Sequence, residues 1–141
     1  MDAFILNELL AEARSSGNDF HEFLRRPALS CGIYRLSAGG ADDQAPHHED
    51  EVYLVLRGSG RLRVGDEDVA VGPGSLVYVA AQVEHRFHNY AEDLEILVLF
   101  APAYTGPMAW LCGTGLGRGD GWLRCERFAP GCRLRIWRRR S

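Results

Sequence analysis

The chain has 141 residues, of which 46% are hydrophobic and 25% charged, and its formal net charge is −3. This length fits one domain, and the composition excludes a disordered chain, a collagen and a coiled coil. No run of the sequence approaches the roughly 18 apolar residues that a membrane span needs. The N-terminus lacks a basic region and a long apolar stretch, so it does not resemble a secretory signal. We therefore expect a cytoplasmic protein without a membrane partner.

The first 27 residues are predicted to form an N-terminal helical segment. Apolar residues recur at helical spacing over residues 3–14, and the Ser-Ser-Gly-Asn sequence that follows ends this helix. A second short helical turn is predicted over residues 20–24.

Residues 28–104 have the pattern of short β-strands rather than of helices. The runs are rich in β-branched and aromatic residues and are separated by glycine-containing turns, including a Gly-Asp hairpin turn at 65–66. The predicted strands cover residues 31–37, 52–56, 60–64, 68–71, 76–79, 85–88 and 94–100. Seven short strands with almost no helix between them predict an all-β sandwich or barrel.

Residues 105–141 differ from the rest and are predicted to form an irregular basic C-terminal tail. From residue 106 onward the chain holds eight arginines and two acidic residues, which gives a local charge of +6. The tail shows neither a steady period nor the interleaved aromatic residues of a nucleic-acid stacking surface. An irregular appendage or a sequence artefact is therefore favoured over nucleic-acid binding.

Histidine and carboxylate residues gather at two places, residues 47–51 and the strand that begins at His85. Side chains alternate between the two faces of a strand, so His47 and Glu51 share one face, and Glu49 shares it by the same parity. In a closed sheet His85 can reach the same point from a distant strand. Imidazole and carboxylate groups together suit divalent ions of the first transition row. The sequence thus predicts one metal site formed by His47, Glu51 and His85.

The other polar residues nearby are assigned to the surface. Parity turns His48 and Asp50 away from the predicted site, and it turns His88 away from His85. His21 lies in the N-terminal region, where we expect it at the surface or packed against the helix.

Two segments resemble the conserved motifs of the cupin superfamily. The first cupin motif, G-x5-H-x-H-x3-E-x6-G, falls on Gly39 or Gly40, Ala45, His47, Glu51 and Gly58. The second, G-x5-P-x-G-x2-H-x3-N, falls on Gly74, Ala80, Gln82, His85 and Asn89. The resemblance covers residues 28–102 and implies a small single-domain cupin. The fold implied is a cupin β-barrel (double-stranded β-helix or jelly roll) with a short N-terminal helical segment.

The chain departs from these motifs at three positions. Ala45 replaces the first histidine of the family, and Ala80 and Gln82 replace its proline and glycine. The resemblance implies one divalent metal ion, and the positions that match leave a set of two histidines and one glutamate with open coordination sites. Such a set suits Fe, Mn, Zn, Ni or Cu. Glu49 or His48 could fill the vacant position if the strand bulges there.

The resemblance implies a small-molecule ligand in the barrel and a homodimer, but it leaves the activity open. One interpretation is a metal-dependent enzyme of dioxygenase, isomerase or lyase type, for which Glu49 is the candidate acid or base. The alternative is a non-catalytic module that binds a small ligand and is metal-free or weakly metallated. A structural or interaction protein is a third class, because one fold hosts many functions.

Overall fold

The structure is a computed structural model that describes residues 1–106. The predicted basic tail lies outside these residues, apart from its first two positions. Within the described part the elements are α1 (Leu6–Ser16), β1 (Phe20–Arg26), β2 (Leu29–Leu36), β3 (Asp50–Arg57), β4 (Gly60–Val64), β5 (Glu67–Val71), β6 (Leu76–Val79), β7 (His85–His88) and β8 (Leu94–Ala101). The helix α1 is too short and too polar to cross a membrane.

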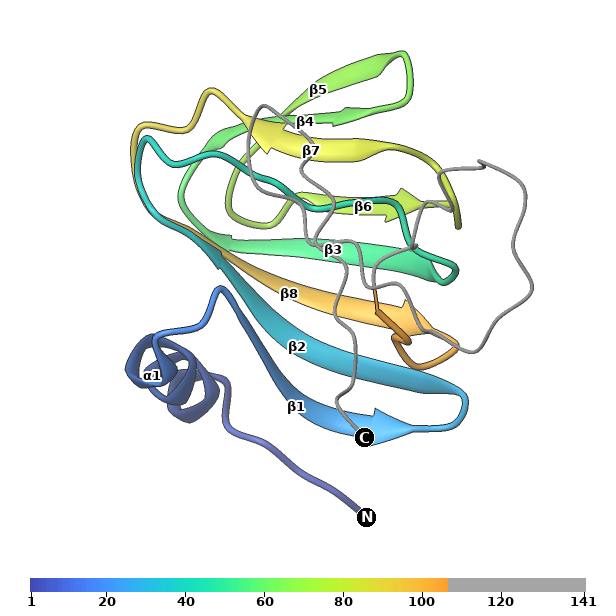
Figure 1. Ribbon diagram of the computed structural model, residues 1–141. Helices are drawn as coiled ribbons and strands as arrows, with labels where there is room; N and C mark the ends of the chain where they lie inside the picture. The colour runs from blue at the N-terminus through green and yellow to red at the C-terminus, as the bar shows by residue number, and fades with distance from the viewer. Residues whose placement is uncertain (107–141) are drawn as a thin grey trace, which may run out of the picture. The chain divides into compact units, whose positions relative to one another are not determined.

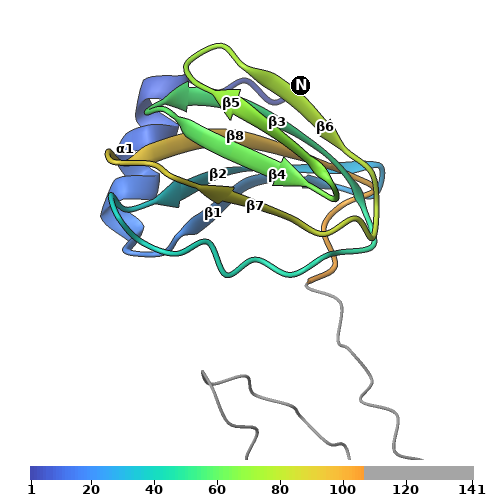
Figure 2. The same ribbon diagram turned by 90° about the horizontal axis from the view of Figure 1, so that it is seen from above.

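The strands form two antiparallel sheets, as the all-β prediction requires. One sheet has the order β1-β2-β8-β3-β6 and the other has the order β5-β4-β7 (Figures 1 and 2). Strand β8 shows the alternation expected of a barrel strand, because Ile96 and Val98 join the core whereas Leu97 faces the opposite side. Tyr53 and Phe87, from opposite sheets, are among the largest side chains buried between them. The prediction of an all-β fold is confirmed.

The prediction of a helical turn over residues 20–24 is wrong, because these residues belong to strand β1. The pairing of β1 with β2 shifts register between Glu22 and Leu24. Phe20 packs on the core between the sheets, whereas Phe23, three residues further on and therefore on the other face, packs against α1. The Phe20 ring covers Gly32 of β2, where an added Cβ atom would meet the ring. Pairing with the next strand, β2, overrides the local helical spacing.

Helix α1 packs against the outer face of the five-stranded sheet and is fixed there by an ion pair. Leu9, Leu10 and Ala13 bury against Ile33 of β2. On the same face, both carboxylate oxygens of Glu95 accept hydrogen bonds from the Arg14 guanidinium at 2.7 Å. Arg35 and Arg57 lie 3.6 and 3.9 Å from the same carboxylate, which is 3% exposed. The hydrogen bonds from Arg14, and then the positive charges around it, hold the pKa of Glu95 below its usual value.

The lowered pKa predicts that Glu95 stabilises the protein except in acid. A depressed carboxyl pKa contributes stability above the unfolded value of 4.5, and the contribution is lost as the pH falls through the folded value. We expect Glu95→Gln to lower the free energy of unfolding by about 1–2 kcal/mol at pH 7 and by much less below pH 4. Urea unfolding at both pH values measures this. Glu84→Gln, which removes an exposed partner of Arg86, is the control and should change little at either pH.

The long connection between β2 and β3, residues 37–49, runs beside β7 (Figure 2). The buried Asp42 accepts hydrogen bonds from the backbone nitrogen of Phe87 at 2.7 Å and from the Tyr34 hydroxyl at 2.7 Å. Further along, the backbone nitrogen of Gln82 donates to the His47 carbonyl at 2.8 Å. These bonds hold the end of the connection, and therefore His47, against the start of β7.

Candidate metal centre

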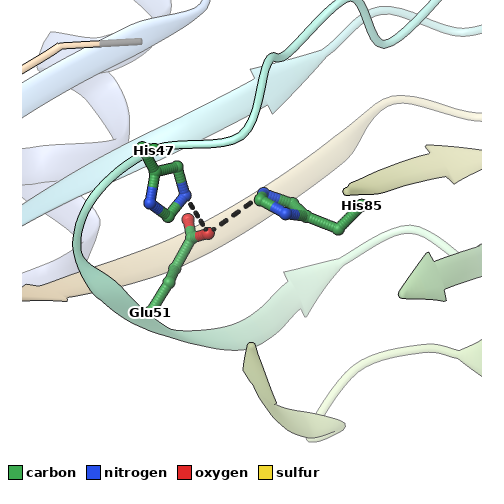
Figure 3. Close-up of side chains that lie close together, drawn as sticks. All are labelled: His47, Glu51 and His85. Atoms are coloured by element: carbon green, nitrogen blue, oxygen red, sulfur yellow. Dashed lines mark hydrogen bonds and ion pairs between the residues drawn. The ribbon is translucent and has the colours of Figure 1, made fainter. Parts of the chain in front are cut away.

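His47, Glu51 and His85 meet inside the barrel although they come from three different segments (Figure 3). His47 lies near the end of the long connection, Glu51 is the second residue of β3, and His85 is the first residue of β7. One nitrogen or oxygen donor from each lies within 4.8 Å of the others. All three residues are buried, with exposed fractions of 3, 2 and 2%. The structure therefore brings together the three residues predicted as ligands.

The hydrogen bonds of the two imidazoles determine which ring nitrogens face the carboxylate. His47 Nδ1 lies 3.0 Å from the backbone oxygen of Glu49, and His85 Nδ1 lies 2.7 Å from that of Val83. A carbonyl oxygen only accepts, so both Nδ1 atoms carry the proton, and in a neutral ring Nε2 then presents a lone pair. The Nε2 atoms of His47 and His85 lie 2.8 and 3.2 Å from Glu51 Oε2. A metal ion, or a proton on one of the Nε2 atoms, relieves the repulsion between these electron-rich atoms.

The shifts in pKa agree with this arrangement. Burial by itself raises the pKa of Glu51, but its contacts with His47 and His85 outweigh burial and hold the pKa below its usual value. Burial by itself lowers the pKa of His85, but the Glu51 carboxylate and the Val83 carbonyl outweigh it and raise that pKa. The surroundings thus favour a positive charge next to a charged carboxylate, and either a proton on His85 or a metal ion supplies one.

Two of the three separations in the donor set also fit a transition-metal ion in size. Nitrogen and carboxylate oxygen ligands lie about 2.0–2.2 Å from such an ion, so two of them at a right angle are about 3 Å apart. The separations of 2.8 and 3.2 Å between the nitrogens and Glu51 Oε2 match that value. His85 Nε2 is buried and has no hydrogen-bond partner within residues 1–106, as expected of an atom that is free to bind a metal.

The remaining residues of the 47–51 cluster lie where strand parity predicts. His48 and Asp50 are exposed, whereas Glu49 is buried with an exposed fraction of 1%. Neither His48 nor Glu49 supplies the ligand that Ala45 lacks. His48 points to solvent, and the carboxylate of Glu49 is 3.7 Å from His47 Nδ1, on the side of the ring away from the other two residues.

The two other predicted histidines also lie as expected. His88 faces away from His85 and contacts the Asp68 carboxylate at 3.1 Å. His21 packs beside α1, with its Nε2 atom 3.4 Å from Glu12.

Aromatic side chains surround the candidate centre. Tyr53, two residues after Glu51 on the same face of β3, is fully buried and its hydroxyl donates to Gln44 at 3.0 Å. Burial, and then the charge of Glu51, raise the pKa of Tyr53. Phe100 packs edge-on against His47 with ring centres 5.0 Å apart. Tyr104 was missed because it follows the last strand, where no periodicity points to the site.

Two motif positions adopt backbone conformations that favour glycine. Gly58 has φ 81°, and an added Cβ atom would lie 2.4 Å from the backbone oxygen of Asp93. Gln82, which occupies the glycine position of the second motif, has φ 67°. The chain therefore keeps the turn of the second motif but forms it with a side chain in the left-handed region.

The comparisons with known proteins agree with the fold and the motifs. The family model described as a cupin domain matches residues 32–100. An uncharacterised protein of Streptomyces coelicolor is 47% identical over 102 residues, which are 72% of this chain and 97% of that protein. The crystal structure of TT1209 from Thermus thermophilus is 26% identical with a TM-score of 0.58, covering 73% of this chain and 99% of the other. A cupin 2 conserved barrel protein from Rhodopseudomonas palustris shares the fold with a TM-score of 0.55 and 22% identity, over 66% and 70% of the two chains.

The fold and the buried histidine–glutamate cluster define a small barrel protein with a candidate metal site. Together with the matches to the family model and to the solved barrels, they show that this chain belongs to the cupin superfamily.

Proposed function

We propose that this cupin binds one divalent transition-metal ion in its barrel through His47, Glu51 and His85 and presents it to a small molecule. The observation that carries the proposal is the orientation of the two imidazoles. Each Nδ1 atom is held by a backbone carbonyl, which leaves both Nε2 atoms directed at one carboxylate oxygen. Fe, Mn, Zn, Ni and Cu all accept such a set.

Three protein ligands would leave coordination positions for a small molecule. A metal bound there supplies Lewis acidity or redox chemistry, which is compatible with dioxygenase, isomerase or lyase reactions. The residues of the chain orient and enclose the ligand, because Phe100 and Tyr53 lie against the two histidines and keep the surroundings apolar. In this proposal Glu49 is not a ligand but supports His47, since its carboxylate lies on the Nδ1 side of the ring.

The alternative is a barrel that binds a small ligand without a metal, which the loss of a ligand at Ala45 favours. The metal content of the purified wild-type protein, before and after dialysis against each metal, separates the two. We expect one tightly held ion per chain after loading with at least one of the five metals. A protein that takes up no ion from any of them contradicts the metal proposal and leaves the metal-free binding module.

We also propose that the protein forms a homodimer through strand β6. This strand is at the edge of the five-stranded sheet, so one side of its backbone is unpaired within residues 1–106. Leu76 and Tyr78 on its outer face are 69 and 60% exposed, and they continue onto Val52 and Leu54 of β3, their register partners. A second copy, related by a two-fold axis, covers such an edge with the same apolar residues.

The dimer predicts that a charge on the outer face of β6 separates the subunits. Leu76→Asp is expected to shift the mass measured by light scattering from that of a dimer to that of a monomer, while the circular dichroism stays unchanged. Ala70→Asp, at an exposed position on the outer face of the other sheet, is the matched control. A wild-type protein that is monomeric at all concentrations, or a Leu76→Asp protein that stays dimeric, contradicts this interface.

A further inference from the structure

Glu49 is a buried carboxylate whose two oxygen atoms have different surroundings. Oε1 accepts hydrogen bonds from the backbone nitrogen of Thr105 at 3.0 Å and from its hydroxyl at 2.5 Å. Oε2 is buried, lies 3.7 Å from His47 Nδ1, and has no hydrogen-bond partner among the described residues. A buried carboxylate with an unpaired oxygen is costly, so its retention calls for a compensating positive charge nearby.

The segment that Glu49 holds, residues 102–106, lies against the face of His47. The Tyr104 ring stacks on Phe100 with centres 4.6 Å apart and meets the His47 ring edge-on at 5.9 Å. Its backbone is fixed at both polar groups, because its nitrogen donates to the Ser30 hydroxyl at 3.0 Å and its carbonyl accepts from Arg25 at 2.9 Å. Burial, and then the charges of Glu49 and Glu51, raise the pKa of the Tyr104 phenol, which agrees with a position beside the candidate centre.

We infer that Glu49 is a positioning residue. It orients the His47 ring from its Nδ1 side and keeps residues 102–106 packed against that ring. This inference rests on the proposed metal site. His47 Nε2 would hold the ion, and the electron density withdrawn from the ring would make Nδ1–H a stronger donor. That donor already faces the backbone oxygen of Glu49 at 3.0 Å, with carboxylate Oε2 just beyond it. Carboxylates behind metal-bound histidines orient the ring and raise its basicity in this way.

The Glu49 carboxylate thus connects the His47 ring to residues 102–106. Glu49 Oε1 accepts hydrogen bonds from Thr105 while Oε2 faces His47. The positions of residues 102–106 and of the imidazole therefore depend on one side chain. The three proposed ligands are only 2–3% exposed, so the residues packed around them shield them from solvent. Gly106, with φ 112°, ends the segment in a conformation that glycine adopts readily.

Two substitutions separate the two roles of Glu49. Glu49→Gln keeps an oxygen that can accept from Thr105 but removes the negative charge beside His47. We expect the metal dissociation constant to rise on the order of 10- to 100-fold, as for other partners of metal-bound histidines. Thr105→Val keeps Glu49 but removes the hydroxyl bond to it. We expect it to release metal to a chelator roughly tenfold faster, with a parallel gain in the hydrogen-exchange rate of the backbone amide at position 105.

The matched control is Thr105→Ser, which retains the hydroxyl and should behave as the wild type in all three measurements. Thermal unfolding of the metal-free variants shows that each is folded. A wild-type metal affinity in Glu49→Gln, or wild-type release and amide exchange in Thr105→Val, overturns the inference while leaving the metal site intact. If the wild type itself binds no ion, the proposed function fails and this inference fails with it, so metal loading of the wild type distinguishes the two failures.

Discussion

His85→Ala is expected to weaken metal binding by at least about 1000-fold. The substitution removes one of three proposed protein ligands, and the loss should exceed the 10- to 100-fold effect of residues that act only behind a ligand. His85 is the only one of the three that comes from the smaller sheet, so its loss leaves both remaining donors on the β3 side of the barrel. Competition with a chromophoric chelator measures the dissociation constants.

His88→Ala is the matched control for this experiment. His88 lies on the same strand, three residues from His85, and contacts Asp68 on the outer side. We expect its removal to change metal affinity by less than about threefold, because it neither faces the proposed ligands nor holds one of them. Equal losses of affinity in the two variants, or none in His85→Ala, would show that the ion binds elsewhere.

Gly58→Ala is expected to lower the free energy of unfolding by about 3 kcal/mol or more. The residue has φ 81°, which strains any side chain, and its Cβ atom would lie 2.4 Å from the Asp93 oxygen and 2.7 Å from Leu94 Cδ2. The Asp93 oxygen is a backbone atom, so the clash is relieved only by moving the chain before β8. Urea unfolding of the metal-free protein measures the change.

Gly74 provides the comparison that isolates the clash from the backbone conformation. It also has positive φ, at 89°, but an added Cβ atom would meet no described atom within 4 Å. Gly74→Ala is therefore expected to cost only about 1 kcal/mol. If both substitutions lower the free energy of unfolding equally, the close approach of Asp93 does not explain why position 58 needs glycine.

The strands predicted correctly are those marked by features within a few residues of the strand itself. Turn residues such as Gly65 and Gly74 separate runs that alternate with a period of two, and these runs form β2 to β8. Strand β1 was predicted as a helical turn because Phe20, Phe23 and Leu24 are three and four residues apart, a spacing that also fits a helix. Its strand conformation comes from pairing with β2, which the local spacing of apolar residues does not record.

The three proposed ligands could be selected from the sequence because parity and motif spacing act over short distances. His47 and Glu51 share a face by counting, and the second motif adds His85. The contacts that hold these residues join positions far apart in the chain. Asp42 bonds the backbone of Phe87, 45 residues away, and Glu49 bonds Thr105, 56 residues away. A periodic pattern in the sequence does not predict such pairs. The residues that support the proposed ligands were therefore identified only from the structure.

Anomalous diffraction from a crystal of the metal-loaded protein tests the central claim most directly. The account predicts one strong peak per chain at the absorption edge of the metal, about 2.0–2.2 Å from the Nε2 atoms of His47 and His85 and from a Glu51 oxygen. A peak bound through an Nδ1 atom, a peak outside the barrel, or a loaded crystal without a peak would contradict it.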